Sequence, residues 1–332
     1  MAANTTTSNA SVIAPRILAD RILGANRPGS ALLASLANIY SLRGEKSGVK
    51  RLNKLGDSGP ATAGTEGTAF TTETVLSYDT EVDLTPPEAA MRLMVVTNRV
   101  IQQRSGYDNA LALFNSGNVD AIVAALDIEA RDIMSSLMEK LEADLAALFS
   151  SLSSSVGALA SDFSLDVVEQ ALFTFDILDL PANAVARRAI CASPRFVSDI
   201  RRELQVTSGG VQGVMWGSQQ SLVAQSSDGV EPIAALFGVP VYQMSQSIVP
   251  TSGTVPGTGG HVCALIVRGS GNPEEEGGSG EVGTLQFCEG AAPQFAVDFS
   301  GRGRSVDLLG VHDYAVALRT TGFGVKILGD DA

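Results

Sequence analysis

One short segment near the N-terminal end places a serine where hydrolases place a nucleophile. Residues 56–60 read GDSGP, and Ser58 lies between small residues as a catalytic serine would. Such a serine needs a histidine as general base, and in the enzymes with this signature that histidine precedes the serine in the chain. The two histidines, His261 and His312, both lie downstream. We therefore interpret residues 56–60 as a loop without catalytic function.

A second segment matches a phosphate-binding pattern but lacks its surroundings. Residues 278–283 (GSGEVG) fit GxGxxG, in which the glycines follow a strand and open a helix whose N-terminus binds pyrophosphate. Here the glycines follow three glutamates at 274–276, and no helical pattern comes after them. Carboxylates would repel a phosphate. The sequence predicts an exposed acidic loop over residues 269–283 and no nucleotide site.

Two residues could bind a metal ion. His261 and Cys263 are zinc-ligand types, but a structural zinc site needs four ligands and no second pair stands at a matching spacing. Alternate positions on one strand explain the pair equally well. We predict no catalytic residue, no cofactor and no metal ion, and hence a protein that is not an enzyme.

Composition indicates a globular chain without membrane spans. Hydrophobic residues make up 45% and aromatic residues 5%, and the length is sufficient for two folding units. The uncharged stretches are interrupted by serine, proline or glycine, so none is expected to cross a membrane. The three cysteines lie far apart, which argues against a disulfide framework.

Charge is divided unequally along the chain. Residues 1–54 hold eight basic and two acidic side chains, whereas the formal net charge of the whole chain is −13. A basic arm on an acidic body is expected to dock on acidic protein surface, its own or a neighbour's. Binding to nucleic acid, or a merely solvated N-terminus, are the alternatives. Arg16 and Arg21 are the arm residues we assign to this contact.

The clearest strand pattern is strongly acidic. Residues 70–84 alternate with a period of two, and residues 89–97 follow two prolines as the expected return strand of a long hairpin. One face of the first strand carries four carboxylates: Glu73, Asp79, Glu81 and Asp83. An isolated two-stranded ribbon is marginal in water, so we expect this hairpin to lie on another subunit, with the basic arm as its partner.

A long helix is predicted over residues 118–150. Its apolar positions recur at helical spacing and form one stripe: Ile122, Leu126, Ile133, Leu137, Leu141, Leu145 and Leu148. The opposite face carries charged residues expected to be solvated or to face a partner: Glu129, Arg131, Asp132, Glu139, Lys140, Glu142 and Asp144. A core helix of an ordinary α+β domain and a coiled-coil arm are the alternatives. The helix would span roughly 45–50 Å.

The remainder reads as a mixed unit that ends in strands. Helices are expected after Ser164 and after Ser193-Pro194, where serine can cap the helix N-terminus. Strands are expected at residues 189–192, 239–244 and 262–267. Residues 295–328 read as a β-meander, with Arg302 and Arg304 at a glycine-flanked tip.

This order of parts resembles the major capsid proteins of tailed bacteriophages, which have the Hong Kong 97-type shell fold, an α+β fold. The phrases that carry the resemblance are VVTNRV at 95–100, IEARD at 128–132 and LFGVPVY at 236–242. The resemblance implies the following parts: an N-terminal arm (1–54), an extended E-loop hairpin (55–97), a peripheral domain with the long spine helix (98–162), an axial domain (163–290) and returning β-strands (291–332).

In function, the resemblance implies a structural protein of the virion. Copies would form pentamers and hexamers and close an icosahedral shell around double-stranded DNA, without sequence-specific binding. Scaffold and portal proteins would be partners during assembly in the host cytoplasm, and decoration proteins could join later. Arg302 and Arg304 look like the loop of this family that gathers at local three-fold axes, where carboxylates should pair with them.

The resemblance leaves alternatives open. An encapsulin, a nanocompartment shell protein that holds protein cargo, shares the fold, and a phage tail or decoration protein is a further reading. The lysine–asparagine isopeptide bonds of some family members are not expected, because no lysine occurs between Lys54 and Lys140. Scaffolding is expected from a separate protein, or the chain is a processed form. The long helix should be continuous, with its stripe packed on residues 295–328.

Overall fold

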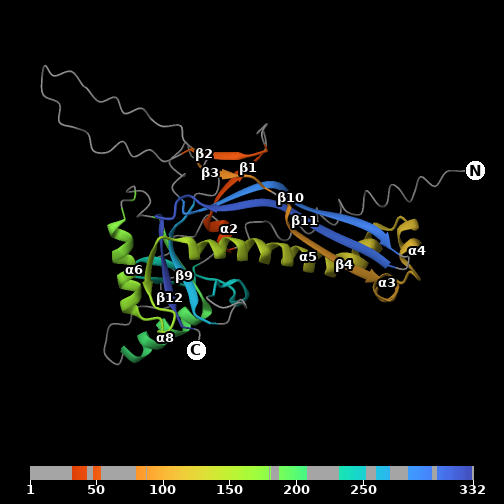
Figure 1. Ribbon diagram of the computed structural model, residues 1–332. Helices are drawn as coiled ribbons and strands as arrows, with labels where there is room; N and C mark the ends of the chain where they lie inside the picture. Colours follow the sequence, from red (N-terminus) through yellow and green to blue (C-terminus); the bar gives the residue numbers. More distant parts are fainter. Residues whose placement is uncertain are drawn as a thin grey trace, which may run out of the picture.

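One long helix backed by β-sheets organises the molecule (Figure 1). In this computed structural model the described residues are 32–42, 48–53, 80–86, 88–178, 180, 187–207, 232–251, 259–269, 283–300 and 305–330. Within them, the strands form sheets of four, six and two members. The six-stranded sheet and its helices form a compact part, and the long helix runs from it into a narrower arm (Figure 1). The mixed helix-and-sheet class agrees with the predicted α+β fold.

The long helix is α5, Val119–Ala147, which is continuous over 29 residues as predicted. The Asn118 side chain caps it by accepting a hydrogen bond from the Ala121 N–H at 3.2 Å. Asp120 in the first turn adds a favourable interaction with the helix dipole. The chain continues as a single 3-10 turn, η2 (Leu148–Ser151), so Leu148 belongs to that turn and not to α5.

The four-stranded sheet covers one side of α5. Its strands, in spatial order, are β1 (Asn38–Ser41), β10 (Leu285–Ser300), β11 (Ser305–Leu318) and β4 (Glu88–Thr97). β10 and β11 pair antiparallel, as do β11 and β4, whereas β1 lies parallel to β10. Gly310 of β11 lies against Ile133 and Leu137 of α5, so strand and helix are in direct contact. The prediction that the helix packs on residues from the far end of the chain is confirmed.

The predicted hairpin partner of residues 70–84 is wrong. Among the described residues of that segment, β3 (Thr80–Leu84) pairs with β2 (Lys50–Asn53), and β4 pairs with β11 instead. Burial explains the choice, because pairing with β11 places Ala90 and Val96 of β4 in the core beneath the sheet. Residues 54–79 lie outside the described residues.

The six-stranded sheet forms the centre of the compact part. Its spatial order is β5 (Ser154–Gly157), β12 (Gly324–Gly329), β9 (His261–Val267), β6 (Arg188–Ala192), β8 (Val239–Gln243) and β7 (Ala234–Leu236). Helices α6 (Leu165–Ile177) and α8 (Pro194–Thr207) pack on it, and their side chains share its core. The predicted serine caps are confirmed: Ser164 accepts from the Val167 N–H at 3.3 Å, and Ser193 accepts from the Phe196 N–H at 3.1 Å.

The predicted β-meander at the C-terminal end is only partly correct. β10 and β11 form its first two strands, but β12 pairs with β9 and β5 in the other sheet. Val325 and Ile327 of β12 are fully buried in the core of that sheet. The burial that β12 gains in the second core therefore decides its place, and the end of the chain links both sheets.

Shorter elements complete the packing around α5. Helices α3 (Asn98–Ser105) and α4 (Ala110–Asn115) follow β4 into the arm and pack on the long helix. Helix α2 (Leu32–Leu36) and the 3-10 turn η3 (Gln246–Ile248) contact it as well. None of the described helices combines the length and the apolar character needed to cross a bilayer.

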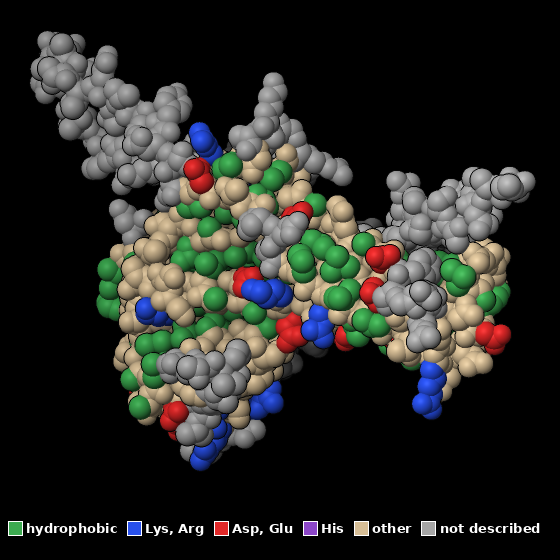
Figure 2. Space-filling view, turned by 45° about the vertical axis from the view of Figure 1, so that its right-hand side comes forward, with side chains coloured by type: hydrophobic (Ala, Val, Ile, Leu, Met, Phe, Trp, Pro, Cys, Tyr) green, Lys and Arg blue, Asp and Glu red, His purple; other side chains and the backbone are tan. Residues whose placement is uncertain are grey.

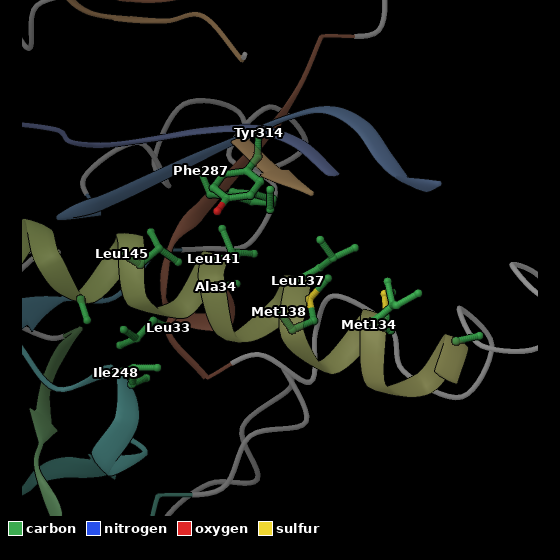
Figure 3. Close-up of a cluster of buried hydrophobic side chains, with 14 of the residues drawn as sticks. Leu33, Ala34, Met134, Leu137, Met138, Leu141, Leu145, Ile248, Phe287 and Tyr314 are labelled. Carbon is green, nitrogen blue, oxygen red and sulfur yellow. The ribbon is translucent and has the colours of Figure 1, made fainter. Parts of the chain in front are cut away.

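The sequence predicted one buried stripe on the long helix, but α5 is buried on more than one side. Leu141 and Leu145 lie on the side of Phe287 and Tyr314, whereas Leu33 and Ile248 lie on the other side of the helix (Figure 3). The predicted stripe is buried within α5, and a second row is buried with it: Val123, Ala130, Met134, Met138 and Ala146. The helix is therefore enclosed between the sheet and the compact part of the molecule.

Candidate assembly surfaces

Most of the residues predicted to form assembly contacts lie outside the described part of the chain: Arg16, Arg21, Glu73, Asp79, Arg302 and Arg304. Glu81 is placed in β3, but its side chain is not among those described. Asp83 faces Arg51 of β2, with 3.7 Å between Oδ1 and Nε. Both side chains are more than half exposed, so this ion pair contributes at most about 1 kcal/mol. The predicted pairing of arm and hairpin stays a prediction.

An exposed apolar surface follows the edge strand β4. Met91, Leu93 and Val95 are 59%, 57% and 55% exposed and point away from α5. In the register of the sheet, Val311 and Leu309 of β11 lie opposite Met91 and Leu93 and are half-buried. We call these five residues the β4 patch. A long edge strand is usually blocked by charge or proline, and the only charge between Met91 and Val95 is Arg92.

A second apolar surface lies on α6. Phe173 and Ile177 are each 66% exposed and stand one helical turn apart, so they form one ridge. Charged side chains border this α6 ridge: Glu169 is exposed one turn earlier, and Asp176 forms an ion pair with Arg188 at 2.8 Å. The opposite face of α6 is buried in the sheet core, so the ridge faces away from the molecule.

The tight turn between β7 and β8 carries a third exposed apolar side chain. Phe237 is 52% exposed and has a φ of 50°, and Gly238 after it has a φ of 78°. Two positive φ values are what a type I′ hairpin turn requires, and Asn-Gly is the sequence that adopts them most readily. Phe237 is the only non-glycine residue with positive φ in the described chain. A bulky aromatic is strained there.

Figure 2 shows one face of the molecule, on which hydrophobic side chains form several separate groups between charged ones. Soluble monomers rarely expose contiguous apolar patches beyond a few hundred Å². The β4 patch, the α6 ridge and the Phe237 turn are therefore candidate surfaces for protein contacts.

Inside the molecule, a carboxylate that was predicted to be solvated is buried. Glu142 of α5 is only 7% exposed and accepts hydrogen bonds from the backbone of α2: Leu33 N–H at 2.8 and 3.0 Å, and Ala34 N–H at 3.1 Å. Burial raises the pKa of Glu142 to about 7, and the two backbone donors lower it in part. The sequence does contain one signal for this burial: Glu142 follows the apolar residues Met134 and Met138 in a row of i, i+4 positions.

The residues that could have done chemistry form a structural cluster. Nε2 of His261 lies 3.2 Å from Nε2 of Gln246, and Nδ1 lies 3.2 Å from Ser193 Oγ. That oxygen also caps α8 by accepting the Phe196 N–H. Cys263 accepts a hydrogen bond from the Ser193 N–H at 3.2 Å, so its sulfur is also engaged.

Ser193, His261 and Cys263 are fully buried. Among the described residues, no three histidine, cysteine, aspartate or glutamate side chains gather as a metal site would require. Packing within the fold therefore accounts for His261 and Cys263.

Comparison with known proteins shows which solved structures share this architecture. No protein-family model matches the chain, and no curated protein matches its sequence. Solved structures do match. The capsid of cyanophage P-SCSP1u aligns over 90% of this chain and 88% of its own, with a TM-score of 0.55 and 10% identity. The chain has the fold of phage capsid proteins.

Two further solved structures share this fold. The capsid of the empty GTA particle, computed with C5 symmetry, aligns over 91% of this chain and 90% of its own, with a TM-score of 0.51 and 12% identity. The SrpI encapsulin of Synechococcus elongatus PCC 7942 aligns over 89% and 85%, with a TM-score of 0.50 and 13% identity. At the level of fold, the resemblance to tailed-phage major capsid proteins is confirmed.

Proposed function

We propose that this chain is a major capsid protein that self-assembles into pentamers and hexamers and builds an icosahedral shell around packaged double-stranded DNA. The observation that carries the proposal is the shared fold, because it extends over about nine tenths of both this chain and a phage capsid chain. In this role the chain is a structural component of the virion and not an enzyme.

The exposed surfaces support association. The outer face of the four-stranded sheet is covered near β1 by β2 and β3, whereas its β4 edge carries exposed apolar side chains. The β4 patch lies on that outer face, at the edge of the sheet, and would be covered by a neighbour in a closed shell. Edge strands with exposed apolar side chains otherwise promote uncontrolled aggregation.

The predicted division of the chain belongs to this proposal. Residues 1–54 would be the N-terminal arm, 55–97 the E-loop, 98–162 the peripheral domain with α5 as its spine, 163–290 the axial domain, and 291–332 the returning strands. Scaffold and portal proteins would act during assembly in the host cytoplasm, and decoration proteins could bind the finished shell.

An encapsulin shell is the second candidate. It is favoured by the SrpI encapsulin, which matches this chain nearly as extensively as the GTA capsid does. Encapsulin and capsid subunits share one fold, so the difference lies in what the particle contains. The test must therefore identify the contents as well as the particle.

Electron microscopy of the expressed protein, together with nuclease-protected nucleic acid measured in purified particles, tests both candidates. Hollow or filled icosahedral particles are expected, and particles isolated from the producing host should contain double-stranded DNA. Particles that hold protein cargo and no DNA would favour the encapsulin. Protein that stays monomeric at high concentration, with no particles in the lysate, would overturn the shell assignment.

A further inference from the structure

We propose that neighbouring copies of this chain contact one another head to tail through the six-stranded sheet: the Phe237 turn of one copy packs on the α6 ridge, Phe173 and Ile177, of the next. This inference rests on the proposed function and deepens it, because it names the two surfaces that join subunits within a ring.

The strand order places the two surfaces at opposite ends of one sheet. Phe237 lies in the turn that connects β7 and β8, and β7 is the last strand at one edge. Helix α6 packs on β5 and β12, the two strands at the other edge (Figure 1). Five strand spacings of about 4.8 Å separate the two edges. One copy therefore cannot bring its own turn onto its own ridge.

The turn is built as a projecting apolar contact. Ile233 precedes β7 and Phe237 follows it, and both are large apolar side chains. They are 39% and 52% exposed. Phe237 occupies a backbone conformation that favours glycine or asparagine, and about half of its surface stays exposed in the subunit. A strained and exposed aromatic is the kind of residue that gains its burial from a partner.

The α6 ridge is an apolar surface on which the Phe237 side chain can pack. Phe173 and Ile177 are the two most exposed large hydrophobic side chains among the described residues, and together they give one turn of helix a continuous apolar strip. The same helix is anchored from behind by Val168, Ala171 and Phe175, which are fully buried. The strip is therefore held rigidly, and an aromatic side chain can pack on it without reordering the subunit.

A second copy of the chain is the occupant that fits both surfaces at once. Two different patches at opposite edges make a heterologous contact, which extends from copy to copy and closes into a ring when the rotation permits. The GTA capsid that matches this chain is computed with C5 symmetry, and a five-fold ring of identical copies requires heterologous contacts. An unrelated partner on either patch would leave the other one exposed.

Cysteine crosslinking in assembled particles tests this contact. The three native cysteines are all fully buried, so thiols introduced at the surface would be the ones that react. In the double variant Phe237→Cys with Phe173→Cys, oxidation should give a ladder of bands above the dimer on a non-reducing gel. Each single variant should give dimers at most, because one thiol per chain cannot extend a head-to-tail series.

The matched control pairs Phe237→Cys with Leu111→Cys, since Leu111 is exposed on α4 in the arm and belongs to neither surface. This control should give no ladder. Particles that form normally while the Phe237–Phe173 pair gives no ladder would overturn the contact and leave the shell assignment intact. Failure of the unmodified chain to form particles would overturn the shell assignment, and the contact with it.

A second measurement separates the contact from the folding of the turn. Phe237→Gly removes both the strain and the aromatic ring, so the subunit should unfold at the same or a higher urea concentration, whereas the assembled rings should dissociate at a lower urea concentration than wild-type rings. Phe237→Asp, which places a charge in the contact, should abolish rings. Rings of Phe237→Gly that withstand urea as well as wild-type rings would contradict the inference, whatever the stability of the subunit.

Discussion

The carboxylate of Glu142 in the long helix holds the N-terminus of α2 by accepting the backbone N–H of Leu33 with both of its oxygens, at 2.8 and 3.0 Å. The first N–H groups of a helix have no partner within the helix, and here a side chain more than one hundred residues away supplies one. α2 leads directly into β1, the edge strand that pairs with β10. One buried acid therefore fixes how the N-terminal part of the described chain enters the sheet.

Subunit stability should depend on pH through Glu142. Its pKa is raised from 4.5 to about 7 in the folded chain, so the native state binds a proton that the unfolded chain has released. The contribution of Glu142 to the free energy of unfolding is therefore largest below pH 4.5. It falls as pH rises from 4.5 to about 7 and is constant above that. The difference amounts to about 3 kcal/mol. Urea unfolding of assembly-blocked subunits at several pH values measures it.

Glu142→Gln should remove most of this pH dependence, because the amide cannot lose a proton but its oxygen still accepts from α2. Glu139→Gln is the matched control, since Glu139 lines the same cavity of about 390 Å³ beside Glu142 without bonding α2. The thiol of Cys191 is the other titratable group coupled to Glu142, and burial keeps its pKa well above neutral. An unchanged pH profile in Glu142→Gln would refute the assignment.

Close packing between β11 and α5 should make Gly310 intolerant of any side chain. A Cβ built at Gly310 would lie 2.2 Å from Cγ2 of Ile133 and 3.2 Å from Cδ1 of Leu137. Gly310→Ala should therefore destabilise the subunit by about 1–3 kcal/mol, as overpacked cores do. Gly322→Ala is the control, because nothing lies within 4 Å of a Cβ at that position. Equal urea midpoints for the two variants would contradict this packing.

Local patterns in the sequence were enough to predict α5, α6, α8, the serine caps of α6 and α8, and most strands, whereas α3 and α4 were not predicted. In Asn118 to Ser150 the helical spacing of apolar residues is visible from one turn to the next, and Ser193-Pro194 is a helix start signal of two residues. Strand pairing was less predictable, because the partners of β4 and β12 depend on which hydrophobic core buries their side chains. Glu142 was misassigned for the same reason: a carboxylate on the polar side of a helical wheel is solvated only if no other element covers it.

The candidate assembly surfaces were predicted least well. Charge asymmetry pointed to Arg16, Arg21 and the acidic strand, most of which lie outside the described residues. The surfaces that the structure does show are apolar, and an exposed Leu93 or Phe173 cannot be distinguished from a core residue by its type alone. Only the fold determines which side of a strand or helix is left uncovered.

A hydrogen bond joins α5 to β11 of the four-stranded sheet. The hydroxyl of Tyr314 donates to Oδ2 of Asp144 at 2.8 Å, and Asp144 also pairs with Lys140 one turn earlier. Tyr314→Phe should cost about 0.5–1.5 kcal/mol, because Asp144 keeps one partner and the ring keeps its packing. Asp144→Ala in a double-mutant cycle isolates the pair, because it removes the acceptor. Additive effects of the two substitutions would show that the bond contributes nothing.

The β4 patch should be needed for assembly and not for folding. Leu93→Glu places a charge on the outer face of the sheet, where the wild-type side chain is 57% exposed, so the subunit should lose no more than about 0.5 kcal/mol of stability. In a shell, the same charge would be buried without a partner, and particles should be lost. Leu111→Glu on α4, where the side chain is 47% exposed, is the matched control. Electron microscopy and sedimentation compare the variants, and particles formed by Leu93→Glu at the wild-type yield would exclude the β4 patch from the subunit contacts.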